Sequence, residues 1–272
     1  MAATRINLVA WHVFKESVRD RVLYAIGAFA LLLVAASFLV RQITAGEDVK
    51  FVKDLGLATI EIAGLLMTVF IGVGLVAREI ERRSIFSLLS KPLARWEFII
   101  GKYLGLVLTI SVNVAGMTVA LYLMLWYLDW NELEVARRAW DAPAADPRLL
   151  IQVAFIIVEL ALLTAIALFF STFSSSALLS VVFTVGLYVA GLLSGDLRNF
   201  GALVEVPGVV AKVVSWIGWL IPAFSAFDVK NQMIHNLAVP AGQIVYTIVY
   251  GALYATVALS AAVAAFSRRE FR

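Results

Sequence analysis

Cysteine is absent from this 272-residue chain, and histidine occurs only twice, at His12 and His235. Without cysteine the chain can form no disulfide and can offer no thiolate to a metal, so the sequence leaves its redox compartment open. Two histidines far apart in the sequence do not make the cluster of imidazoles that a zinc site needs. We therefore expect no metal site and no cofactor within this chain.

Charged residues are also scarce. They make up 15% of the chain against 62% hydrophobic residues, and the mean hydropathy is +0.93. A chain this apolar is typical of a membrane protein with several spans, and helices satisfy their own backbone groups in lipid. The period-two alternation of a membrane barrel is missing. We predict a single all-α transmembrane domain over residues 1–272, surrounded by the lipid bilayer.

Six apolar stretches have the length of roughly 20 residues that a helix needs to cross a bilayer core about 30 Å thick. They are Val22–Val40, Leu55–Ala77, Ile99–Leu128, Leu149–Phe170, Ala177–Gly195 and Ala241–Phe266. A seventh stretch, Phe200–Phe227, is interrupted by charged residues and prolines. There we expect short re-entrant or interfacial helices, so residues 196–240 form an external interfacial segment before the last span.

The basic residues give this arrangement its orientation. If residues 1–21, 78–102, 171–176 and 267–272 face the cytoplasm, those 58 residues carry 13 Lys and Arg. The 79 residues of the external segments 41–54, 129–148 and 196–240 carry 9. This roughly twofold excess inside follows the positive-inside rule and predicts that both termini are cytoplasmic. Since membrane topology explains the basic residues, we expect no nucleic acid partner.

Residues 1–21 precede the first span and show helical spacing of polar and apolar side chains. Lys15 and Arg19 recur on one side, while Trp11 and Phe14 lie on another. Such a pattern predicts an amphipathic helix in the cytoplasmic interface, with Trp11 and Phe14 in contact with lipid. The alternative is an ordinary cytoplasmic extension of the first span.

The cytoplasmic loop 78–98 is the most informative segment. Glu79 and Arg83 stand four residues apart, so a helix would pair them on one face. An apolar patch follows at Ile85, Phe86, Leu88 and Leu89. It can pack against the protein's own helices or fill a groove on a partner. Pro92 can begin the helix that continues into the third span.

In this loop the sequence resembles the permeases of type 2 ABC transporters, and most closely the branch of copper-enzyme maturation permeases. The shared order is a charged helix end, a small residue, a Leu pair, a Pro, an Arg and a closing Gly-Lys. Here these are Glu79 to Arg83, Ser84, Leu88-Leu89, Pro92, Arg95 and Gly101-Lys102. Ser84 is a mild departure, since many members have Gly or Thr there. The likeness extends to Phe14–Arg21 and to Ile221-Pro222-Ala223-Phe224 with Phe227-Asp228.

The resemblance implies that the loop is a coupling helix held by a separate ABC ATPase. The residues implied in this contact are Glu79, Glu81, Arg82, Arg83, Phe86, Leu88, Leu89, Pro92 and Arg95. The chain itself has no Gly-x-x-x-x-Gly-Lys-Ser/Thr phosphate loop, so ATP and Mg are expected on the partner. The resemblance also implies an exporter in the bacterial inner membrane, with two ATPase copies and a second permease chain, most simply in a homodimer.

Two carboxylates, Glu61 and Glu159, lie inside predicted spans, where an ionised side chain costs several kcal/mol unless it is paired or hydrated. They can line a transport path or relay protons, or they can hydrogen-bond to a neighbouring helix near the outer interface. A path would also suit an ion-gradient-driven transporter or channel. A further alternative is a non-transporting scaffold for a soluble partner. Separately, Gly101 and Gly105 predict close helix packing at the start of the third span.

Overall fold

The computed structural model describes residues 2–40, 48–74, 94–131, 134, 143–174, 176–203, 207–235 and 237–268. Every regular element in these ranges is a helix, which agrees with the predicted all-α class. The elements are α1 (Ala2–Val18), α2 (Arg21–Val40), α3 (Asp48–Met67), the π-helical turn η2 (Thr68–Val73), α6 (Arg95–Asn131), α8 (Leu149–Phe173), α9 (Ala177–Leu192), α10 (Ser194–Arg198), α11 (Phe200–Leu203), α12 (Gly208–Leu220), the 3-10 turn η3 (Phe224–Phe227), α13 (Lys230–Ile234) and α14 (Ala241–Arg268).

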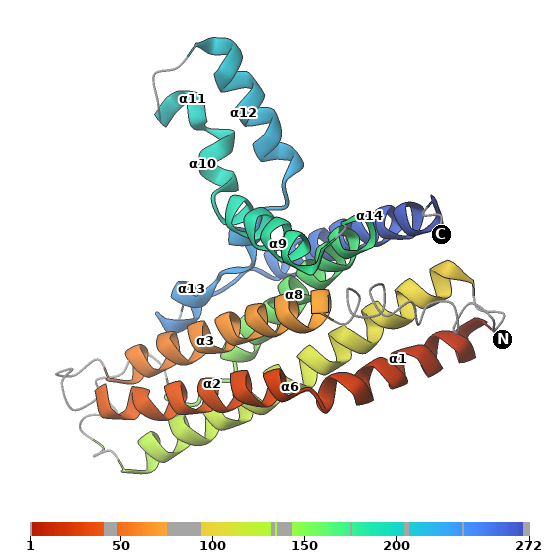
Figure 1. The fold of residues 1–272 in the computed structure, drawn as a ribbon. Coiled ribbons are helices and arrows are strands. Elements are labelled where there is room, and N and C mark those ends of the chain that lie inside the picture. Colours follow the sequence, from red (N-terminus) through yellow and green to blue (C-terminus); the bar gives the residue numbers. More distant parts are fainter. Residues whose placement is uncertain are drawn as a thin grey trace.

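The long helices form an elongated bundle with α8 at its centre (Figure 1). Helix α8 is apolar all round, and its side chains are buried on every face, as expected of a helix enclosed by others. It packs against α14, α6, α9 and α3. The close approach of α3 and α8 depends on Gly64, where an added Cβ would collide with the Leu160 side chain.

In the part of the chain that the structure describes, four helical stretches are long and apolar enough to cross a membrane: Val49–Val73, Arg95–Asn131, Leu149–Phe173 and Ala241–Arg268. They coincide with four of the six predicted spans. A bent pair, Gly208–Leu220 with Phe224–Ile234, gives a fifth if it is counted as one span. The two other predicted spans fall on α2 and α9, whose apolar stretches in the described part of the chain are shorter.

The two ends of the bundle are identified by contacts between distant segments. At one end Arg95, at the start of α6, donates hydrogen bonds from Nη1 to the carbonyl oxygens of Phe266 and Ser267 at the end of α14. At the other end Lys53, near the start of α3, donates from Nζ to Pro143 O at 2.7 Å. Helix α1 lies at the Arg95 end, beside the first turns of α6.

Helices α10, α11 and α12 project from the bundle as an arm (Figure 1). The arm is held together at Arg198, which donates from Nε to Gly218 O at 3.0 Å and lies 4.5 Å from the Trp219 ring centroid. Ser215 Oγ donates to Arg198 O at 2.9 Å. The outward side of α12 is apolar, with Trp216 and Leu220 largely exposed.

Candidate functional site

The loop that carries most of the predicted ATPase contact falls between the described residues 74 and 94. Glu79, Glu81, Arg82, Arg83, Phe86, Leu88, Leu89 and Pro92 therefore lie outside the described residues, and their role stays a prediction. The structure does describe Arg95 and the helix into which this loop leads.

The start of α6 is tied to both termini of the chain. Glu97 accepts a hydrogen bond from the Ala94 N–H at 3.1 Å, which satisfies a free amide at the beginning of the helix. The same carboxylate lies 3.8 Å from the Arg5 guanidinium of α1. Arg95 satisfies two terminal carbonyls of α14, an arrangement that suits a cation at a helix C-terminus. A displacement at the start of α6 would thus act on α1 and α14 together.

Helix α1 coincides with the predicted helix in residues 1–21. It also packs against another helix, a contact that the sequence analysis did not predict. Val13 and Ser17 are the buried residues of α1, and Val13 packs against Gly105 of α6. An added Cβ at Gly101 would come 2.7 Å from Val9 Cβ, and one at Gly105 would come 2.6 Å from Ala10 O. The prediction of close packing at Gly101 and Gly105 is therefore confirmed, with α1 as the partner.

The four residues proposed for the membrane interface lie along the rest of α1 and just after it. Trp11 is exposed and its ring stacks on Phe14 with centroids 5.4 Å apart. Lys15 Nζ lies 5.2 Å from the Trp11 ring centroid, and Arg19 follows the helix in an exposed turn. Contact of Trp11 and Phe14 with lipid stays a prediction, and Trp11 is accessible for it.

The structure brings the two membrane carboxylates together. Helix α3 begins at Asp48, seven positions before the predicted span, so Glu61 lies near the middle of the apolar stretch Val49–Val73 rather than close to its end. Glu159 lies near the middle of α8. The two carboxylates are near enough to interact electrostatically, and the Tyr188 hydroxyl of α9 is within reach of both.

Lys230 of α13 provides the cation of this cluster. Its Nζ lies 2.9 Å from Glu61 Oε2 and 3.8 Å from Asp228 Oδ2. The backbone beside it is also anchored, because the Val229 N–H donates to Gln152 Oε1 of α8 at 2.9 Å. Segment 224–234 therefore reaches the middle of the bundle, although its residues were predicted to lie in an external segment.

Glu159 is the least solvated member of the cluster. It is 2% exposed, and its Oε1 atom has no hydrogen-bond partner among the described residues. Gln152 Nε2 on the same helix is also buried, and no described residue hydrogen-bonds to it. Sequence analysis found both carboxylates but missed Lys230, Tyr188 and Gln152. The available signal was weak: Lys230 follows Asp228 in a segment otherwise poor in charge, and a Tyr or Gln in an apolar helix has many possible roles.

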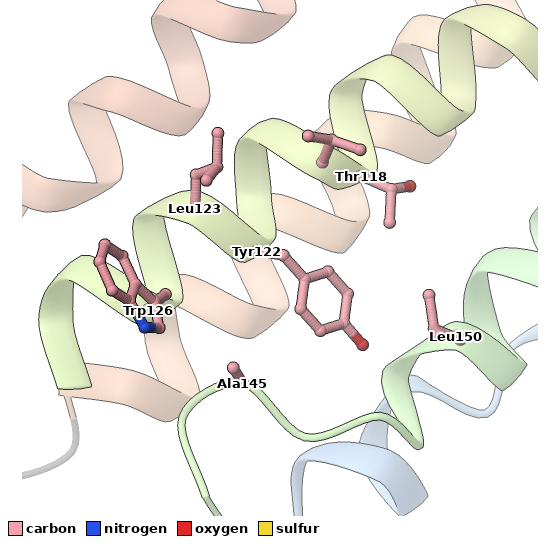
Figure 2. Close-up of a pocket in the computed structure, with 7 residues that line it drawn as sticks. Thr118, Tyr122, Leu123, Trp126, Ala145 and Leu150 are labelled. Atoms are coloured by element: carbon pink, nitrogen blue, oxygen red, sulfur yellow. The ribbon is translucent and has the colours of Figure 1, made fainter. Parts of the chain in front are cut away.

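A groove of about 430 Å³ lies elsewhere, between α6 and residues 145–150. Figure 2 shows Tyr122, Leu123 and Trp126 of α6 on one side, with Ala145 and Leu150 opposite. Both hydroxyls of its lining are already used, since Thr118 donates to Val114 O and Tyr122 donates to Asp146 O. The groove consequently presents an apolar surface and is separate from the carboxylate cluster.

Comparison with known proteins agrees with the membrane architecture and with the loop resemblance. The family model described as ABC-2 family transporter protein matches residues 8–271, nearly the whole chain. The match does not single out the branch of copper-enzyme maturation permeases. A search of curated proteins gives no significant match. The chain belongs to the ABC-2 family of transporter proteins, whose members are integral membrane components of ABC transporters and work with a partner ATPase.

Proposed function

We propose that this chain is the permease subunit of an ATP-driven exporter, in which a separate ABC ATPase docks on loop 78–98. Two copies of the chain, with two ATPases, would enclose the transport path, since one chain has little interior of its own. Both termini and the docking loop would face the cytoplasm of a bacterial inner membrane.

The observation that best supports mechanical coupling is the attachment of Arg95 and Glu97. Through them the helix that follows the loop is bound to α14 and α1. When the ATPases close on ATP they would push the loop, and these three helices would tilt as a unit. The energy of ATP hydrolysis then reaches the membrane as a rigid-body movement, a common form of switching in transport proteins.

The test is co-purification of the chain with its ATPase. Leu88→Asp places a charge in the apolar patch, and Arg83→Glu reverses a charge at its border, so each should abolish ATPase association while the protein stays folded. Leu220→Asp is a matched control, because Leu220 is an exposed apolar residue of the arm. Docking at the loop is wrong if either loop variant retains a full complement of ATPase and transports normally.

A second candidate is transport driven by an ion gradient, and the buried cluster of Glu61, Glu159 and Lys230 favours it. Ionisable groups at mid-membrane are typical of ion-coupled transporters. This candidate predicts substrate movement in vesicles that contain no nucleotide, and loss of that movement in Glu159→Gln. Dependence on ATP under the same conditions would exclude it.

A further inference from the structure

The membrane cluster carries more negative than positive charge. Glu61, Glu159 and Asp228 contribute three carboxyl groups, and among the described residues Lys230 is the cation beside them. Asp228 is about half exposed, with 48% of its side chain accessible, so solvent can screen it. Glu61, with 15% of its side chain accessible, and Glu159, which is 2% exposed, are screened far less, and in the described part of the chain Lys230 is the ammonium group near them.

An uncompensated carboxylate at this depth is costly. Removing an ion from water costs several kcal/mol unless a counter-ion and hydrogen bonds replace the water. Glu159 has neither in full, since its Oε1 atom is buried without a partner. A positive group beside this oxygen would stabilise the cluster, and it can be either a proton on Glu159 or an added cation.

The chemistry of an added cation is indicated by the one that is present. Lys230 shows that a primary ammonium fits against Glu61 at a hydrogen-bonding distance of 2.9 Å. Aromatic rings border the same place: the Tyr188 ring centroid lies 4.9 Å from that of Phe224, and Phe224 packs on Phe227. Aromatic faces attract organic cations, and a hydroxyl group such as that of Tyr188 can accept a hydrogen bond from one.

The position of Lys230 also suggests how such a cation would reach Glu159. Lys230 is carried by a five-residue helix between the arm and α14, and Asp228 lies beside it at the exposed side of the cluster. A ligand would meet Asp228 first, then the Lys230–Glu61 pair, and Glu159 last. Lys230 therefore acts as a tethered competitor for the same carboxylates.

We propose that Glu159, Glu61 and Tyr188 form a binding site for a primary ammonium group of an external ligand, and that Lys230 partly occupies this site in the structure described here. The ammonium belongs either to a soluble amine or to the headgroup of an amine-bearing lipid. That the ligand is the transported molecule rests on the function proposed above, whereas the binding itself does not.

The experiment measures binding of propylammonium to the purified chain in detergent by calorimetry, without any ATPase. Wild-type protein should bind propylammonium saturably and should not bind the neutral analogue 1-propanol. Glu159→Gln should lose this binding. Lys230→Ala should bind propylammonium at least tenfold more tightly, because the competing ammonium is gone. Glu134→Gln, the same change at an exposed residue beyond α6, should behave as wild type.

Thermal unfolding gives a second readout that does not depend on the fold of Glu159→Gln. Lys230→Ala leaves Glu61 without its partner and should unfold at a lower temperature than the wild type. Propylammonium should raise the unfolding temperature of this variant toward the wild-type value, and 1-propanol should not. Restoration by low pH alone would overturn the proposal, because the positive group would then be a proton. Equal propylammonium binding by wild type and Glu159→Gln would overturn it as well.

The two sources of the ammonium are separated in nanodiscs. If the ligand is a lipid headgroup, phosphatidylethanolamine should raise the unfolding temperature of the wild type relative to phosphatidylcholine, and Glu159→Gln should abolish the difference. If the ligand is a soluble amine, the wild type should have the same unfolding temperature in the two lipids, and added amine should raise that unfolding temperature. No response to either the lipid or the soluble amine would refute the site, while leaving ATPase docking on loop 78–98 untouched.

Discussion

Arg95 Nη1 lies 2.6 Å from the carbonyl oxygen of Ser267, so the first residue of α6 is bonded to the end of a helix 172 positions further along the chain. The same group donates to Phe266 O at 3.2 Å. Arg95 was assigned to ATPase contact from the loop resemblance alone. Its position in the structure supports a role in holding α6 to α14.

Arg95→Ala separates these two roles. Losing hydrogen bonds from a charged donor near the surface should lower the stability of the protein by about 1 kcal/mol, visible as a lower unfolding temperature. The ATPase should still co-purify, but transport should fall because α14 no longer moves with α6. Arg268→Ala, at an exposed position on the end of α14, is the control and should change neither. Loss of ATPase binding in Arg95→Ala would instead indicate that Arg95 contacts the ATPase.

Gly105→Ala tests the contact between α1 and α6. The added methyl group would come 2.6 Å from Ala10 O, so the backbone of α1 must shift. Overpacking of this kind costs about 1–3 kcal/mol, and we expect a lower unfolding temperature. Gly116→Ala on the same helix has no neighbour within 4 Å of the new methyl and should instead be neutral or slightly stabilising. Similar effects of both substitutions would mean that α1 does not pack on α6.

Much of the fold could be predicted from apolar length and small residues. Four predicted spans coincide with helices that are long and apolar enough, and the Gly101 and Gly105 pair marks a close helix contact. The partner at that contact was missed because α1 was interpreted from Trp11 and Phe14, which are large and conspicuous. Val13, which packs against Gly105 of α6, is an ordinary residue in an amphipathic helix.

The start of α3 was misplaced for a physical reason. Lys50 and Lys53 were counted in the predicted external segment 41–54, yet both lie within α3. Lys53 is 1% exposed, and its long apolar stem lets Nζ reach Pro143 O beyond the helix. Extending α3 in this direction puts Glu61 deep enough to meet Glu159. Their meeting, and the return of Lys230 to the same place, depend on tertiary packing that periodicity along one sequence does not contain.

Tyr122→Phe tests the attachment of residues 143–148 to α6. The Tyr122 hydroxyl donates to Asp146 O at 2.7 Å, and removing it leaves a carbonyl of this segment without that partner. We expect a loss of about 1 kcal/mol in the free energy of unfolding, measured by thermal or denaturant unfolding in detergent. Tyr246→Phe removes a hydroxyl from an exposed tyrosine of α14 and should have a smaller effect. A larger effect at Tyr246 would contradict the importance of this bond.

The orientation of the chain can be tested with single cysteines, since the natural sequence contains none and gives no background labelling. Ala3 and Ser267 are exposed at the Arg95 end of the bundle, whereas Glu134 is exposed beyond the other end of α6. A membrane-impermeant maleimide should therefore label Glu134→Cys in intact cells, and label Ala3→Cys and Ser267→Cys only in inverted vesicles. Labelling of Ala3→Cys and Ser267→Cys from opposite sides would show that the predicted number of spans has the wrong parity. Labelling of both from outside would place the 78–98 loop away from any cytoplasmic ATPase, and the proposed coupling would then fail.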